Sequence, residues 1–176
     1  GLNDNKLLLQ FMKVCPIPNY YFEKNFIKIR NEILIQIYNL NFKKNYLKFL
    51  IALSTQCFLN EYIYLTTVDE KIKIKKINER INKQINSNKV NDLDIAILAC
   101  YEPIYKYSWS NKINISRNLA EIFKLQYDDF KEEKKLSSTI ISLKNITDNI
   151  SIKVKNQYEE NPYPRWTNLG LSIESR

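Results

Sequence analysis

The sequence predicts an all-α fold of about seven or eight helices packed around a central buried helix, ending in an extended, proline-rich C-terminal segment. Three observations support this fold class. Apolar residues recur at intervals of three and four along most of the chain, as on one face of a helix. Only two glycines and five prolines are present, too few for the tight turns of an all-β fold. Hydrophobic residues make up 44% and charged residues 26% of the 176 residues, which is typical of a globular domain.

Two helices are expected before residue 40. Leu8, Met12 and Cys15 form a short apolar stripe that Pro16 and Pro18 bring to an end. The second helix is expected from about 19 to 39, because apolar residues recur there at spacings of four, three, four and four. The residues of this second stripe are Phe22, Phe26, Ile29, Ile33 and Ile37.

A third helix is expected from about 44 to 65 and is predicted to be the central one. It is apolar on nearly every side, which usually indicates a helix surrounded by others. The residues expected to face the core are Leu47, Leu50, Ile51, Cys57, Phe58, Tyr62 and Leu65.

The fourth and fifth helices have clear start signals. Thr67 and Glu70 form a capping box, in which each side chain bonds the other residue's backbone N–H. The stripe that follows is Ile74, Ile77, Ile81 and Ile85. The fifth helix is expected to start at Asn91 or Asp92, to run through Cys100 and to stop near Pro103.

The remaining segments mix aromatic turns with two further helices. Tyr105, Tyr107 and Trp109 are predicted to be aromatic packing at a corner, with a ligand shelf as the alternative. A helix capped by Asn114 or Ser116 is expected next. It would place four side chains inward: Leu119, Ile122, Phe123 and Phe130.

The final helix is expected to be capped by Thr147 or Asp148 and to carry Ile150, Val154 and Tyr158. It should end before Pro162, because a residue that precedes proline disfavours helical angles. Residues 1–166 are interpreted as one helical domain and 167–176 as a linker or tail.

The scarcity of histidine and glycine excludes several classes of catalytic and binding site. The chain has no histidine, so triads that use an imidazole base cannot be built, and no metal site is predicted. The two glycines cannot form a glycine-rich loop for phosphates or dinucleotides. Cys15, Cys57 and Cys100 are widely spaced and are expected to be free thiols packed among apolar residues. We therefore expect no catalytic residue and no bound cofactor in this chain.

The net charge and the hydropathy of the chain indicate whether nucleic acid or a membrane is an expected partner. The formal net charge is +8, and lysines lie along the fourth helix. A nonspecific nucleic-acid module using residues 71–89 is one alternative, but no recognised nucleic-acid motif accompanies the charge, so nucleic acid is not the expected partner. The longest apolar runs are too short to span a bilayer and no export signal is visible. A cytoplasmic protein without a membrane partner is expected.

One segment near the C-terminus differs from the rest of the chain. Two carboxylates, two prolines, an arginine and aromatic residues are interleaved in it, and these aromatic and arginine types are enriched at interface hot spots. It is predicted either to dock onto a following domain or to close this domain's own core. This docking segment is Tyr158, Glu159, Glu160, Asn161, Pro162, Tyr163, Pro164, Arg165 and Trp166.

At this segment the chain resembles a known family. Residues 157–166 read QYEENPYPRW, and 56–62 read QCFLNEY. Both are similar to segments of the helical region that precedes the catalytic domain in class I S-adenosylmethionine-dependent methyltransferases, often with tetratricopeptide repeats upstream. The resemblance implies that a methyltransferase domain holding S-adenosylmethionine follows this chain after a short linker. It also implies that the methyltransferase domain, and a protein substrate as a further candidate, are the partners.

A polar cluster is expected to join the matched segments. Glu61 is predicted to lie beside the most buried helix, at least half buried, and to be bonded to an arginine or to several donors. Arg30 and Arg165 are the candidate partners, since guanidinium binds a carboxylate in a bidentate manner. The predicted cluster is Gln56, Asn60, Glu61 and Arg30.

The leading hypothesis is a non-catalytic helical domain that braces a methyltransferase or positions its substrate or partner. The main alternative is a stand-alone helical adaptor that binds a protein or peptide in a groove between helices. Catalysis by carboxylates alone is a remote alternative, because adjacent residues such as Glu159 and Glu160 point in different directions on a helix.

Overall fold

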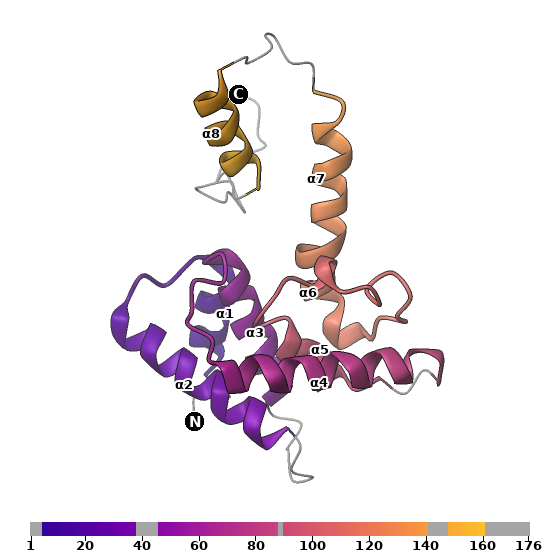
Figure 1. Cartoon of the computed structure of the whole chain (residues 1–176). Helices are drawn as coiled ribbons and strands as arrows, with labels where there is room; N and C mark the ends of the chain where they lie inside the picture. The colour runs from indigo at the N-terminus through magenta and orange to yellow at the C-terminus, as the bar shows by residue number, and fades with distance from the viewer. Residues whose placement is uncertain (1–4, 38–45, 88–89, 141–147, 161–176) are drawn as a thin grey trace, which may run out of the picture. The chain divides into compact units, whose positions relative to one another are not determined.

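A computed structural model describes residues 5–37, 46–87, 90–140 and 148–160 of the chain (Figure 1). The predicted all-α class is confirmed, because the described residues form helices and turns and contain no β-strand. The chain divides into two compact units, residues 1–138 and residues 139–176, each considered by itself. Within the described ranges, no helix combines the length and the apolar character needed to cross a membrane.

Helices α1 (Lys6–Val14) and α2 (Tyr20–Gln36) both begin at an asparagine cap. The side chain of Asn5 accepts from the backbone N–H of Leu8, and Asn19 does the same for the first turn of α2. The face that α2 buries is shifted from the predicted stripe, since Phe22 is exposed. The side chains it buries are Phe26, Arg30, Ile33 and Leu34.

Helix α3 (Tyr46–Leu59) is the most buried helix, as its all-round apolar surface predicts. Every residue from Phe49 to Leu59 is buried, and α1 and α5 pack against it. The prediction that this helix continues to about residue 65 is wrong. Glu61 and Tyr62 adopt left-handed backbone angles, with φ of 57° and 56°, and these angles turn the chain away from the helix axis. Leu65, expected in the core, is consequently exposed.

Helix α4 (Val68–Gln84) begins with the predicted capping box and leads into a 3₁₀ turn, Ile85–Ser87. Thr67 accepts from the backbone N–H of Glu70, and the Glu70 carboxylate accepts from the backbone N–H of Thr67. Ile77 and Ile81 are its fully buried apolar residues, at the centre of the predicted stripe. Figure 1 shows α4 as a long helix lying beside α5.

Helix α5 (Asp92–Leu98) starts after the predicted cap Asn91 and is almost entirely buried. A 3₁₀ turn, Ile104–Lys106, follows it. The rings of Tyr107 and Trp109 then stack 5.0 Å apart between centroids, and Trp109 is buried. The aromatic segment therefore packs as a corner of unit 1.

The next helical run changes geometry along its length. It comprises a 3₁₀ turn (Arg117–Leu119), helix α6 (Ala120–Phe123), a π-helical turn (Lys124–Asp128) and helix α7 (Asp129–Ser137). The buried side chains come from the first three parts, whereas α7 buries none.

Helix α8 (Asn149–Glu160) belongs to the second unit. Asp148 caps it as predicted, accepting from the backbone N–H of Ser151 at 2.8 Å. Hydrogen bonds from the backbone and side chain of Ser151 lower the pKa of the Asp148 carboxyl. The predicted boundary between a domain ending at 166 and a tail from 167 lies outside the described residues.

Candidate functional site

Only the beginning of the predicted docking segment is described by the structure. Tyr158 and Glu159 lie in the last turns of α8, both exposed, and Glu160 ends the helix. Asn161, Pro162, Tyr163, Pro164, Arg165 and Trp166 lie outside the described residues. Helix α8 is described up to Glu160, so the predicted stop before Pro162 lies at the edge of the described residues and stays a prediction.

Helix α8 carries an exposed apolar stripe that leads into the docking segment. Ile150, Val154 and Tyr158 follow one another at intervals of four, so they share one face. All three are exposed. The ion pair of Lys155 and Glu159, 3.4 Å between nitrogen and oxygen, lies on another part of the helix surface. Exposed apolar faces of this kind are typical of helices that pack onto a partner.

The residues of the predicted polar cluster have different surroundings. Gln56 is fully buried, and its amide, oriented to satisfy both atoms, donates to the Cys15 carbonyl and accepts from the N–H of Ile17, each at 3.2 Å. It joins α3 to the turn after α1. Asn60 and Glu61 are partly buried in the turn that follows α3, whereas Arg30 is buried on α2.

Arg30 binds backbone carbonyls that lie far apart in the sequence. Its guanidinium donates to the carbonyl of Leu65 at 2.7 Å and to the carbonyl of Cys100 at 3.3 Å. A weaker contact, 3.4 Å, reaches the hydroxyl of Thr66. The guanidinium carbon also lies 4.0 Å from the ring centre of Tyr101, which adds a cation–π attraction. Arg30 thereby fixes the segment after α3 to the end of α5.

The carboxylate that accompanies Arg30 is Glu70, which the sequence analysis assigned only to the helix cap. One Glu70 oxygen lies 4.0 Å from the Arg30 guanidinium and accepts from the Tyr101 hydroxyl at 2.8 Å. The other oxygen accepts from the backbone N–H of Thr67 at 2.7 Å. Arg30 and Glu70 are both buried. We call Arg30, Glu70 and Tyr101 the ionic cluster.

A groove of about 670 Å³ lies against the ionic cluster. Residues 63–66 form one side of it, and Tyr101 contributes to both the groove and the cluster. The side that α4 provides consists of Lys71, Ile74, Lys75 and Asn78, and Glu102 and Tyr107 complete the lining. We call this the α4 groove. Its volume and mixed lining are within the range of sites that bind ligands or peptide side chains.

Gln126 joins three segments of unit 1 through its amide. It is fully buried in the π-helical turn. Its amide nitrogen donates to the carbonyls of Ser54 at 3.1 Å and Ala99 at 3.5 Å, and its oxygen accepts from the N–H of Ile104 at 3.3 Å. The π-helical turn thus joins α3 and the segment that follows α5 through a single side chain.

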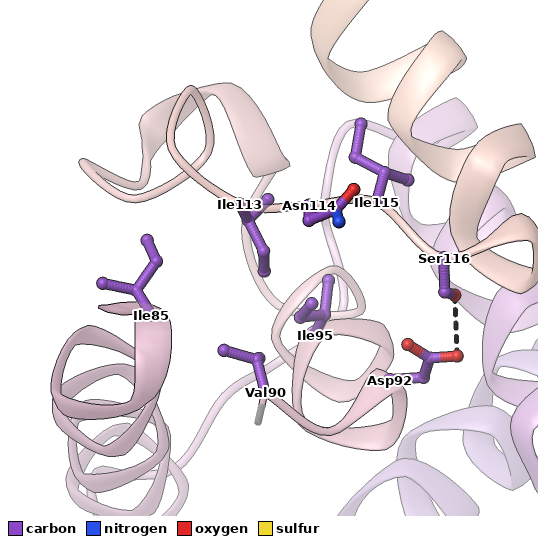
Figure 2. A pocket seen from close by; sticks show the side chains of 8 residues that line it. All are labelled: Ile85, Val90, Asp92, Ile95, Ile113, Asn114, Ile115 and Ser116. Carbon is purple, nitrogen blue, oxygen red and sulfur yellow. Dashed lines mark hydrogen bonds between the residues drawn. The ribbon is translucent and has the colours of Figure 1, made fainter. Parts of the chain in front are cut away.

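A second, smaller cavity of about 270 Å³ is lined mainly by isoleucines and Val90 (Figure 2). Its carboxylate, Asp92, accepts from the Ser116 hydroxyl at 2.7 Å and from the Asn118 amide at 3.1 Å. Figure 2 shows the Ser116 hydroxyl facing that carboxylate. These bonds hold the segment before α6 onto the start of α5, which is a structural role.

Burial keeps the hydroxyls of Tyr101 and Tyr107 and the thiol of Cys100 in their neutral forms. Burial, above all, raises the pKa of the Tyr101 and Tyr107 hydroxyls, so they stay protonated near neutral pH. Burial and the neighbouring Cys57 also raise the pKa of the Cys100 thiol, which keeps it from forming a nucleophilic thiolate. Among the described residues, no group of three or more acidic or cysteine side chains could hold a metal ion.

Sequence reasoning missed the groove and half of the ionic cluster. Residues 63–65 were expected within a continuous α3, which would have hidden the groove. Glu70 was recognised as a cap, and its burial followed from no sequence signal. Comparison of the chain with protein families, with curated proteins and with solved structures finds no match.

Proposed function

We propose that this chain is a non-catalytic helical domain that precedes an S-adenosylmethionine-dependent methyltransferase domain and braces it or positions its substrate or partner. The support comes from one feature, the exposed stripe of Ile150, Val154 and Tyr158 on α8. This stripe leads directly into residues 157–166, the longest segment that resembles the methyltransferase-associated region. A helix that presents apolar side chains next to an aromatic and arginine-containing segment is suited to packing against a neighbouring domain.

A binding experiment with the methyltransferase domain tests the bracing role. The two domains would be produced separately and mixed, and their affinity measured by calorimetry. Val154→Ala/Tyr158→Ala should weaken the complex at least about tenfold, because truncated anchor residues at interface centres cost 2 kcal/mol or more. The matched control is Asn149→Ala/Asn156→Ala, which changes two exposed polar residues on the opposite face of α8. Equal affinity for the two double variants would refute the docking role of the stripe.

A titration with S-adenosylmethionine tests the non-catalytic part of the proposal. The chain has no histidine and only two glycines, so it lacks a glycine-dependent cradle for the cofactor. We expect no heat of binding at micromolar concentrations of S-adenosylmethionine. Micromolar binding by this chain alone would contradict the proposal.

A stand-alone peptide-binding adaptor is the second candidate function, and the α4 groove favours it. The groove combines apolar, aromatic and charged lining residues between helices, as in helical adaptors that bind peptides. The two candidates differ in the surface used: α8 for the methyltransferase domain and the α4 groove for a peptide. The α8 double variant therefore separates them, since it should leave peptide binding unchanged.

A further inference from the structure

We propose that the α4 groove binds an acidic, amphipathic peptide segment of another protein. The inference deepens the second candidate function by naming the chemistry of the peptide. It concerns unit 1 alone and requires no methyltransferase domain.

Exposed aliphatic side chains lie along one side of the groove. Ile63 and Leu65 line it and are 66% and 79% exposed. Val68 and Ile72, at the start of α4, are 73% and 49% exposed. Single exposed apolar residues are ordinary on protein surfaces, but Ile63 and Leu65 line the same groove, and exposed apolar side chains gathered at a groove are typical of an interaction site.

The backbone between α3 and α4 holds Ile63 and Leu65 in place. The turn after α3 places Glu61 and Tyr62 in left-handed conformations, each costing about 1–2 kcal/mol for a residue other than glycine. Tyr62 is held there because its N–H donates to the Cys57 carbonyl at 2.8 Å and its hydroxyl donates to the Ala99 carbonyl at 3.2 Å. The Leu65 carbonyl is bound by buried Arg30 at 2.7 Å. The apolar side of the groove is therefore fixed in place before any partner binds, which lowers the entropic cost of binding.

The charge of the groove lining favours an acidic partner. Lys71, Ile74, Lys75 and Asn78 share one face of α4, so two exposed ammonium groups flank an apolar side chain along the groove. Glu102 is the acidic residue that lines the groove. The lining is therefore net positive, like the whole chain at +8. A peptide with apolar anchors and carboxylates complements both properties.

A nucleic acid fits the same surface less well. Phosphate backbones bind best along continuous positive stripes. Here exposed Asp69 precedes the lysines of α4, exposed Glu79 interrupts them, and Glu102 lies in the groove itself. A phosphate backbone would also leave the exposed aliphatic side chains in water, with no gain from apolar burial. The apolar side chains of a peptide would cover them and remove their surface from water, which is favourable.

Selection from a random peptide display library tests this inference. The wild-type chain should enrich peptides that combine at least two aliphatic or aromatic positions with acidic residues. Lys71→Glu/Lys75→Glu should weaken the binding of these peptides at least about tenfold, measured by fluorescence anisotropy, because it replaces two ammonium groups along the groove with two carboxylates. The same variant, used as bait, should enrich peptides with lysine or arginine in place of the acids. That gain can occur only if the variant is folded.

The matched control is Lys76→Glu/Lys83→Glu, which changes the net charge equally at exposed sites of α4 outside the groove. It should change the affinity for the selected acidic peptide less than about threefold, since charges at the margin of an interface have small effects. A further variant, Ile63→Ser/Leu65→Ser, should abolish enrichment without altering the helical circular dichroism.

Three results would overturn the inference. The first is enrichment of no peptide by the wild-type chain. The second is equal weakening by the groove and control charge reversals. The third is binding of a single-stranded RNA oligonucleotide that outcompetes the selected peptide. A failure of the methyltransferase proposal is distinguishable from these results, because the substitutions Val154→Ala and Tyr158→Ala lie in the other unit and should not alter peptide affinity.

Discussion

Replacing Arg30 with methionine should lower the free energy of unfolding of unit 1 by about 3–5 kcal/mol. The guanidinium is buried and binds the carbonyls of Leu65 and Cys100, and methionine can bind neither. The substitution also leaves the buried Glu70 carboxylate without its cation. Methionine fills much of the same volume, so a simple cavity contributes little to the expected loss.

The magnitude follows from the individual contacts. Hydrogen bonds that involve a charged group contribute about 1.5–3 kcal/mol each, and the bond to Leu65, at 2.7 Å, is the shortest that Arg30 makes. The bond to Cys100, at 3.3 Å, should contribute less. Glu70 keeps two donors, Tyr101 and the backbone of Thr67, which limits the cost of losing a cation 4.0 Å away. A loss of this size is a large part of the roughly 5–15 kcal/mol that stabilises a typical domain.

Urea denaturation followed by tryptophan fluorescence measures this loss. The chain has two tryptophans, so Trp166→Phe leaves buried Trp109 as the reporter of unit 1. Lys28→Met is the control on the same helix, because Lys28 is exposed and its ion pair with Glu32 spans 3.9 Å. The control should change stability by less than about 0.5 kcal/mol.

A loss of less than about 1 kcal/mol for Arg30→Met, or a loss no larger than that of the Lys28 control, would show that Arg30 is not a main source of stability. The double variant Arg30→Met/Glu70→Met gives a second check. Replacing both members of a buried ion pair with apolar residues often restores stability. The double variant should therefore recover part of the loss, and a double variant less stable than Arg30→Met by several kcal/mol would show that Glu70 acts mainly through other partners.

Three further predictions use the same urea assay. Burial raises the pKa of the Asp94 carboxyl, although the nearby Arg80 guanidinium lowers it, so the folded state binds this proton more tightly than the unfolded state does. The stability of the wild type relative to Asp94→Asn should therefore rise as the pH falls from 7 to 4. A difference that stays constant with pH would contradict this. The Tyr107 hydroxyl is buried without a hydrogen-bond partner among the described residues, so Tyr107→Phe should be neutral or stabilising by up to about 1 kcal/mol, whereas Tyr101→Phe should cost about 1–2 kcal/mol. Gln126→Leu leaves three buried backbone groups without this partner and should cost about 2–4 kcal/mol; a loss below about 1 kcal/mol would show that they find other partners.

The parts of the fold that could be predicted depend on neighbouring residues in the sequence. The capping box of Thr67 and Glu70 and the asparagine cap of α5 are local signals, and both are confirmed. The burial of α3 follows from its composition alone. The helix is apolar on nearly every side, so any side left in water would expose apolar surface at a large cost in free energy.

The end of α3 could not be predicted, because its turn carries none of the usual residues. Left-handed positions are normally glycine or asparagine, and here they are Glu61 and Tyr62. Long-range hydrogen bonds from Tyr62 to the Ala99 carbonyl and from Arg30 to the Leu65 carbonyl stabilise the turn instead. Such contacts join residues more than thirty positions apart, so no local pattern predicts them. The α4 groove depends on this turn and was missed for the same reason.

The same contacts make the shape of the groove depend on the ionic cluster. Tyr101 lines the groove with its ring and donates its hydroxyl to Glu70, and Arg30 fixes the carbonyl of Leu65 on the opposite side. Tyr101→Phe keeps the ring but removes one link between the two sides. It should therefore weaken a selected acidic peptide more than Tyr107→Phe, which also keeps its ring but breaks no hydrogen bond to the described residues. Anisotropy measured in the absence of urea decides this, since both variants remain folded there. Equal affinities for the two variants would show that the groove keeps its shape without the cluster, and that residues 63–66 are held by their backbone bonds alone.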